Sequence, residues 1–169
     1  MSRNLSASGI KDAKQLYAFF ESAAPEKCGA KEKALAKRLA TYYIAEAKTE
    51  GINSDCAFVQ MCLETGFLTF GNLVTIEMHN YCGLGAIDRD HRGEVFASEQ
   101  EGVRAHIQHL HAYATSEDVL LKNPLIDNRY KWVKPRGKAK SVFELAGTWA
   151  MDKDYGKKLD ALLERLEDF

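Results

Sequence analysis

The sequence predicts a single, mainly helical domain with a small β-hairpin lobe inserted after a central helix. Most of its 169 residues show apolar side chains at helical spacing, and this period lapses between residues 71 and 97. The length suits one domain, and 46% hydrophobic with 28% charged residues is typical of a globular chain. Basic and acidic residues nearly balance, for a net charge of −1, so no overall field recruits nucleic acid or a membrane.

Two helices are expected before the central one. Residues 10–24 carry apolar side chains at helical spacing, and Pro25 follows as a stop signal. Residues 31–50 are rich in helix formers, and Gly51 stands where a C-terminal glycine cap belongs. We therefore expect residues 1–30 to contribute an N-terminal helix to the single domain.

The predicted central helix is the most hydrophobic segment of the chain. Every residue of 56–63 except Gln60 is apolar, and a helix that is apolar all round is normally buried. Three polar residues that precede it are candidate N-caps: Asn53, Ser54 and Asp55. The segment ends at Glu64, so a carboxylate terminates the helix that we expect at the centre of the domain.

Beyond the central helix, short apolar pieces at 83–87 and 94–96 flank a polar turn and predict the hairpin. A capping box at residues 98–101 opens the next helix. A second capping box at 141–144 predicts a helix that carries Trp149. A last helix, with leucines at 159, 162, 163 and 166, follows Asp154.

No metal, cofactor or membrane span is expected. The four cysteines have neither a CxxC nor a zinc-ribbon spacing. Residues 1–20 lack the apolar core of a signal peptide, and no apolar stretch approaches about 20 residues. We expect a monomer that stays cytoplasmic until it is released or exported by another route, unless the sequence is a trimmed piece.

Glu64 is the strongest candidate for chemistry. A carboxylate at a helix C-terminus lies at the negative end of the helix dipole, and apolar surroundings disfavour its charged form. Both effects raise its pKa, as a general acid near neutral pH requires. An ordinary surface glutamate that closes a helix fits the same pattern equally well.

Four segments in order carry a resemblance to a known family: residues 57–66, 79–86, 102–110 and 149–155. They resemble the glucosaminidases of glycoside hydrolase family 73, and together they cover about residues 31–166. The resemblance implies a lysozyme-like helical fold. It also implies cleavage of the β-1,4 bond between N-acetylglucosamine and N-acetylmuramic acid in peptidoglycan, with Glu64 as general acid and the cell wall or periplasm as the site of action.

The second catalytic group is left open by the resemblance. Three carboxylates lie in the predicted lobe, and we favour Glu94 over Asp88 and Asp90. Alternatively, the substrate's own N-acetyl oxygen attacks the anomeric carbon, a known exception to the two-carboxylate mechanism. Tyr155, which matches the family's functional tyrosine, would then orient or stabilise that group.

Sugar contacts are expected from one amide and two aromatic side chains. Asn80 matches a family asparagine and either contacts sugar or shapes a turn. Tyr130 and Trp132 lie in a less regular segment and are candidates for a sugar-binding groove, whereas Trp149 is expected in the core. The family's Trp-Gly after the acid is Phe67-Leu68 here, and the first asparagine of its usual pair is His79.

Two other functions remain as alternatives. The first is a non-catalytic glycan-binding or wall-assembly module on the same fold. The second is a Cys-dependent cell-wall peptidase that uses Cys62 or Cys82 with His79 or His106.

Nucleic-acid and metal binding rank lower. The segment 129–140 interleaves basic and aromatic residues, as single-stranded nucleic-acid binders do, but the near-zero net charge makes nucleic acid the last choice. His106 and His109 lack a third ligand, so we expect solvent-facing histidines rather than a metal site.

Overall fold

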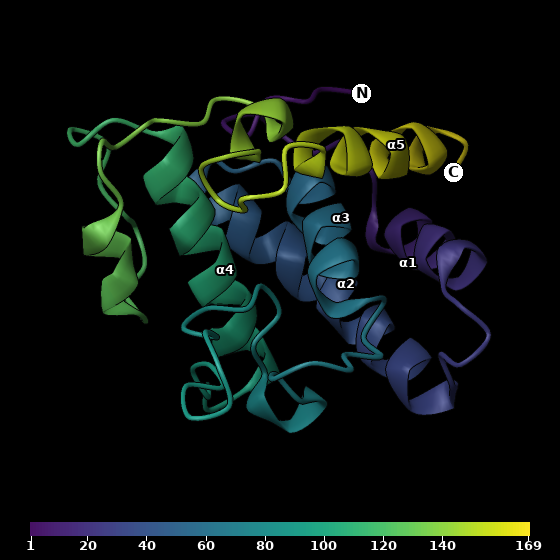
Figure 1. The fold of residues 1–169 in the computed structure, drawn as a ribbon. Coiled ribbons are helices and arrows are strands. Elements are labelled where there is room, and N and C mark those ends of the chain that lie inside the picture. Colours follow the sequence, from purple (N-terminus) through teal and green to yellow (C-terminus); the bar gives the residue numbers. More distant parts are fainter.

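A computed structural model describes all residues 1–169 and confirms the mainly helical prediction (Figure 1). β structure is limited to three isolated bridges, and none of the helices combines the length and apolar character that a membrane span needs. The elements are α1 Ala13–Ala23, α2 Ala30–Glu50, α3 Ser54–Thr65, α4 Glu99–Ala114 and α5 Tyr155–Glu167, with short 3₁₀ helices η1 Ile76–Met78, η2 Asn128–Trp132 and η3 Val142–Leu145.

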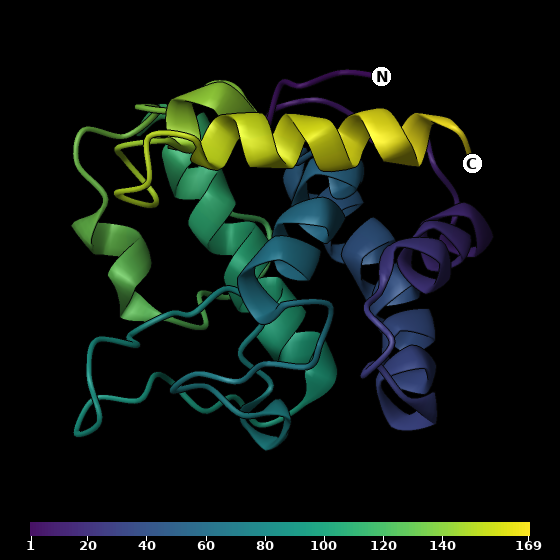
Figure 2. The same ribbon diagram turned by 45° about the vertical axis from the view of Figure 1, so that its right-hand side comes forward.

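α3 is the buried centre of the domain, as its apolar run predicts. It contacts all four other α-helices, and every residue from Ser54 to Cys62 is buried. Asn53 caps its start by accepting hydrogen bonds from two backbone N–H groups of the first turn. Gly66 ends it in the left-handed conformation, with φ 56°. Figures 1 and 2 show α5 across the top of the molecule and the segment between α3 and α4 at the opposite end.

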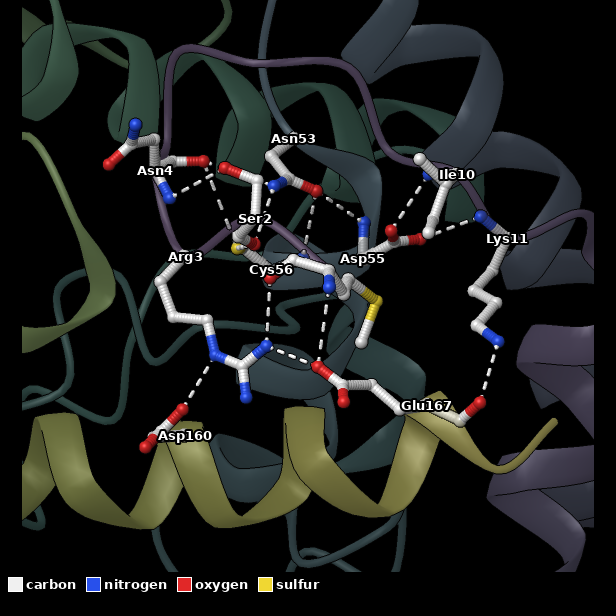
Figure 3. A network of polar contacts seen from close by, with 11 residues as sticks. Ser2, Arg3, Asn4, Ile10, Lys11, Asn53, Asp55, Cys56, Asp160 and Glu167 are labelled. Atoms are coloured by element: carbon white, nitrogen blue, oxygen red, sulfur yellow. Dashed lines mark hydrogen bonds and ion pairs between the residues drawn. The ribbon is translucent and has the colours of Figure 1, made fainter.

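The residues before α1 form an extended arm that crosses the start of α3 (Figure 3). The buried Asp55 carboxylate accepts the backbone N–H groups of Ile10 and Lys11 at 2.8 and 3.2 Å. The Asn53 amide donates to the carbonyl groups of Ser2 and Asn4. The first turn of α3 is therefore tied to the N-terminal arm on both sides.

The same arm is bound to α5 through one arginine. Arg3 lies 2.6 Å from Asp160 and 2.5 Å from Glu167, which are both on α5 (Figure 3). These ion pairs are partly exposed, so water screens them and they add little to stability. Their structural effect is to join the start of α3 to α5, the two helices that carry Glu64 and Tyr155.

The segment between α3 and α4, which we call the lobe (residues 71–97), contains no hairpin strands. The predicted hairpin is reduced to one antiparallel bridge between Ala86 and Arg92. Gly83 and Gly85 adopt positive φ values of 70° and 73°, which interrupt an extended strand. The Asp88 carboxylate accepts the backbone N–H groups of Asp90 and His91 and forms a local turn instead of a ladder.

The predicted helix around Trp149 is also absent. The chain forms only one 3₁₀ turn, η3, and the Ser141 side chain makes no cap hydrogen bond. The Glu144 carboxylate accepts the backbone N–H of Lys140 instead. Gly147 then turns into the left-handed region at φ 79°, so Trp149 lies in the loop between η3 and α5.

Candidate active-site cleft

A cleft of about 510 Å³ lies between the end of α3, the lobe, α4, and the loop before α5. Its walls mix apolar side chains with a few polar groups, as ligand sites usually do. The residues that line it are Glu64, Thr65, Phe70, Asn72, Leu73, Val74, Asn80, Cys82, Gly83, Leu84, Gly85, Ala86, His109, Tyr113, Arg129, Trp149 and Ala150.

Glu64 presents its carboxyl group to this cleft from the last turn of α3. Its Oε1 accepts a hydrogen bond from the Tyr155 hydroxyl at 2.5 Å. The surrounding protein desolvates the carboxylate and raises the pKa of Glu64, while Tyr155 and Trp149 favour the charged form and oppose this shift. The direction agrees with the one predicted from the sequence. The side chain itself stays open to solvent on the cleft side.

Tyr155 is the first residue of α5 and is buried behind Glu64. Its oxygen accepts a hydrogen bond from Gln60 Nε2 at 3.0 Å. Burial and the neighbouring Glu64 raise the pKa of Tyr155 far above its usual value, so the hydroxyl keeps its proton. That proton is donated to Glu64, and an action of Tyr155 on the substrate's N-acetyl group stays a prediction.

His106 lies further inside the core, against the prediction that it faces solvent. It is fully buried, with Nε2 at 2.8 Å from Gln60 Oε1 and Nδ1 at 2.7 Å from the Tyr43 hydroxyl. Burial lowers the pKa of His106 to about 3, so the ring is neutral. The spacing of the sequence indicates this burial, because His106 lies three residues after Val103 and four before Leu110, on the apolar stripe of α4.

His109, the other histidine of that pair, lines the cleft in a half-buried position. Burial lowers its pKa to about 4, with Asp127 opposing and Arg129 reinforcing the shift. It is therefore neutral near pH 7. Across the chain, no group of three or more His, Cys, Asp or Glu side chains is arranged to hold a metal ion.

Asn80 organises the lobe. Its amide nitrogen donates to the carbonyl groups of Leu84 at 2.8 Å and Glu94 at 3.1 Å, and its oxygen accepts the Leu84 N–H at 3.0 Å. The side chain is buried, so these bonds replace a strand ladder in holding the two arms of the lobe together. Although Asn80 also borders the cleft, a contact with sugar stays a prediction.

Of the three carboxylates considered as the second catalytic group, Glu94 is the only one whose side chain bonds to a residue that lines the cleft. It lies 2.9 Å from Nη1 of Arg129, which also binds Asp127 at 3.0 Å. Asp88 and Asp90 are exposed in the polar turn, and Asp88 pairs with its neighbour His91. The bond to His91 lowers the pKa of Asp88.

The aromatic residues are placed differently from the expectation. Trp149 lines the cleft, with ring centroids 5.0 Å from His109 and 5.1 Å from Tyr113. Tyr130 and Trp132 lie outside the lining residues: Tyr130 stacks on His111, and the exposed Trp132 lies under the Arg129 guanidinium. Sugar binding by these two residues stays a prediction.

Cys82 is the only cysteine in the cleft wall, and all four cysteines are buried and free. Burial raises the pKa of the Cys82 thiol far above its usual value, with Glu64 adding to the shift. No hydrogen bond joins Cys62 or Cys82 to a histidine, and both nitrogens of His106 are already bound. The thiolate that a cysteine nucleophile needs is thus disfavoured.

The buried central helix ends in a carboxyl group within a cleft, which is the arrangement that the sequence resemblance implies for a lysozyme-like glycoside hydrolase. Residues 40–168 match the family model Glucosaminidase, described as mannosyl-glycoprotein endo-β-N-acetylglucosaminidase. The match covers well over half of the chain, and the protein belongs to this glucosaminidase family.

Two comparisons extend this result. The chain is 43% identical over 131 residues to a protein of Borreliella burgdorferi that is described as uncharacterized, covering 78% of this chain and 63% of the relative. It thus spans less than two thirds of that relative. The catalytic domain of the autolysin Auto from Listeria monocytogenes has the same fold, with a TM-score of 0.54 and 16% identity over 94% of this chain and 96% of that domain.

Proposed function

We propose that the protein is an endo-acting N-acetylglucosaminidase that cleaves the β-1,4 bond between N-acetylglucosamine and N-acetylmuramic acid in peptidoglycan. Glu64 is its general acid. The observation that carries this proposal is the Glu64 carboxyl group itself, which opens into the cleft with a raised pKa and accepts a hydrogen bond from Tyr155.

In the proposed reaction, protonated Glu64 donates its proton to the glycosidic oxygen as the bond from that oxygen to the anomeric carbon breaks. The leaving oxygen keeps the electron pair of the broken bond, and positive charge develops at the anomeric carbon. The Tyr155 hydroxyl stabilises the carboxylate that forms on Glu64. A positioned general acid of this kind contributes about 10²–10⁴-fold to the rate.

For the second group, we propose Glu94. Its carboxylate lies outside the cleft lining but binds Arg129, which is part of that lining, and the Asn80 amide donates to the backbone carbonyl of Glu94. To act as base or nucleophile, the Glu94 carboxylate must release the Arg129 guanidinium and contact a water molecule or the substrate instead. The N-acetyl oxygen of the substrate is the competing group, and it needs no lobe carboxylate.

We favour peptidoglycan as the substrate because the solved structure with the same fold is the catalytic domain of an autolysin. The description of the family model names glycoprotein glycans, which contain the same N-acetylglucosamine unit. We therefore propose the cell wall or periplasm as the site of action, and a high-mannose glycopeptide is the appropriate second substrate to test.

Product analysis tests the proposal. Purified peptidoglycan is digested, reduced with borohydride and analysed by mass spectrometry. N-acetylglucosaminitol ends are expected, whereas N-acetylmuramitol ends would contradict the proposed bond. Co-sedimentation with peptidoglycan without any new ends would identify a glycan-binding module. New amino groups would identify a peptidase, and cleavage of only the glycopeptide would assign the activity to that substrate.

A further inference from the structure

A continuous line of five hydrogen-bonded side chains runs from the protein core to the cleft. Tyr43 on α2 is 2.7 Å from His106 on α4, which is 2.8 Å from Gln60 on α3. Gln60 is 3.0 Å from Tyr155 on α5, which is 2.5 Å from Glu64. We call these five residues the polar chain. Only Glu64 lines the cleft, so the other four act on it from behind.

The direction of each bond follows from what the groups can donate. Gln60 Nε2 only donates, so the Tyr155 oxygen is an acceptor and its proton points to Glu64. Gln60 Oε1 only accepts, so Nε2 of His106 carries a hydrogen. The neutral ring then has a bare Nδ1, which accepts the hydroxyl proton of Tyr43. Every donor in the polar chain therefore points toward Glu64.

This direction decides which oxygen of Glu64 carries the acidic proton. Because Oε1 accepts a hydrogen bond from Tyr155, the proton of the carboxylic acid is placed on Oε2. Oε2 faces Gly83 of the cleft lining, where an added Cβ would lie 3.8 Å away. With the opposite direction, Glu64 would donate its own proton back to Tyr155, away from a bound substrate.

The polar chain is not explained by packing. Gln60 is the one polar residue in the apolar run of α3, and His106 is a fully buried imidazole among core side chains. Burying such groups costs free energy unless all their bonds are made, and a hydrophobic side chain would fill either position without that requirement. Their presence indicates a role outside the core itself.

We propose that Gln60 and His106 are positioning residues that hold the Tyr155 hydroxyl in the donor direction toward Glu64 Oε1, so that the acidic proton stays on the cleft-facing Oε2. Their role in turnover rests on the proposed function, while the hydrogen-bond direction can be measured without any activity.

The first test is the protonation of His106, measured by long-range ¹H–¹⁵N NMR on protein labelled at histidine. The His106 signal is assigned by its loss in His106→Gln. We expect hydrogen on Nε2, none on Nδ1, and no titration between pH 5 and 8. Hydrogen on Nδ1 would overturn the proposal because it reverses every bond from Tyr43 to Tyr155. Titration in this range would overturn it as well.

The second test is Gln60→Leu, with Gln108→Leu as a matched control. Gln108 is also a buried glutamine, but it binds the backbone of Pro124 and Ile126 and lies outside the polar chain. We expect Gln60→Leu to lower kcat about tenfold with little change in KM, because the fold and the cleft surface stay intact. The control is expected to keep the kcat of the original protein.

A readout that needs no turnover accompanies the kinetics. The pKa of Glu64, followed by the ¹³C shift of its carboxyl carbon, is expected to rise in Gln60→Leu, since donation from Tyr155 is no longer enforced. It is expected to stay unchanged in Gln108→Leu. Neither variant alters the other groups that face Glu64 or line the cleft beside it, namely Trp149, Cys82, His109 and Arg129.

Tyr43→Phe provides a milder variant, because it keeps the packed ring and removes only the hydroxyl group at the far end of the polar chain. We expect hydrogen to stay on Nε2 of His106, because Gln60 Oε1 still accepts it, and a smaller loss of kcat than in Gln60→Leu. If Gln60→Leu changes neither the Glu64 pKa nor the His106 protonation, or if Tyr43→Phe moves the hydrogen to Nδ1, the proposal is wrong. If the NMR results hold but no glycan is cleaved, the proposed function fails and the hydrogen-bond direction stands.

Discussion

Tyr155, the first residue of α5, donates its hydroxyl proton to Oε1 of Glu64, the next-to-last residue of α3. The bond joins two positions that are 91 residues apart in the chain. The position of the Glu64 carboxyl group relative to Tyr155 therefore depends on how α5 packs against α3. Arg3 and Asp55 support this packing, because they bind the N-terminal arm to α5 and to the start of α3.

Replacing Tyr155 by Phe should shift the pH dependence of cleavage. The lost hydrogen bond favours the carboxylate, so its removal raises the pKa of Glu64. A general acid works in its protonated form, and activity falls as the pH rises through its pKa. The alkaline limb of kcat/KM should therefore move to higher pH in Tyr155→Phe. The maximal rate should fall about 10–100-fold, since a bond to a charged group contributes about 1.5–3 kcal/mol. An alkaline limb that stays in place or moves to lower pH would contradict this assignment.

Glu64→Gln should make the folded protein more stable near neutral pH. The pKa of Glu64 is raised in the folded state, so folded protein holds this proton more tightly than unfolded chain. The carboxylate therefore costs stability above the folded pKa, and this cost disappears below the unfolded value, about 4.3. Thermal unfolding at pH 7 and pH 3.5 measures the difference. We expect a modestly higher Tm for Glu64→Gln at pH 7 only, because the cleft leaves the carboxylate in contact with water. A lower Tm at pH 7 would show that the carboxylate stabilises the fold.

Variants of the ion pair between Glu94 and Arg129 distinguish the two candidates for the second catalytic group, Glu94 and the substrate's N-acetyl oxygen. If Glu94 acts in catalysis, Glu94→Gln should lower kcat at least about 10²-fold. Arg129→Gln, which removes the other side of the same ion pair, should lower it by less than about tenfold. Equal and small losses in both variants would mean that the pair only fastens the lobe, and would favour attack by the substrate's N-acetyl oxygen.

Ligand-dependent fluorescence should come from one of the two tryptophans. Trp149 lines the cleft, whereas Trp132 lies outside the lining residues and stacks under Arg129. Titration with N-acetylglucosamine oligomers should change the emission of the original protein and of Trp132→Phe, but not that of Trp149→Phe. A signal that disappears in Trp132→Phe would instead support the expectation, drawn from the sequence, that Trp132 binds sugar.

The close packing at the start of α5 predicts a sensitive glycine. A Cβ on Gly156 would lie 2.6 Å from the Cα of Phe143 in η3, so the backbone must move. We expect Gly156→Ala to cost about 1–3 kcal/mol in urea unfolding. It should also lower activity, because Tyr155 precedes it. Lys157→Ala, on the exposed side of the same turn, should change stability by no more than about 0.5 kcal/mol. Similar losses in both variants would show that the close contact is not the cause.

The sequence predicted best where local pattern and burial agree. The apolar run before Glu64 indicated a buried central helix that ends in a carboxylate, and the structure confirms both features. The hairpin and the Trp149 helix failed because left-handed glycines at 83, 85 and 147 override the pattern of the residues around them. One such residue in a short segment is enough to prevent a strand or stop a helix.

The polar chain could not be predicted from the sequence, for a different reason. The bond between Tyr43 and His106 spans 63 residues, and the bond between Gln60 and Tyr155 spans 95. No spacing rule relates such positions, and Gln60 and His106 each looked like an isolated exception on a helix. Only the packing of α2, α3, α4 and α5 against one another brings them together.

The most direct test of the central claim is the rate at which Glu64→Gln releases reducing ends from purified peptidoglycan. Glu77→Gln, an exposed glutamate in η1, serves as the control. We expect a loss of about 10²–10⁴-fold for Glu64→Gln, with normal co-sedimentation with peptidoglycan, and no loss for the control. Glycan cleavage by Glu64→Gln at the rate of the original protein would contradict the assignment of Glu64 as the acid.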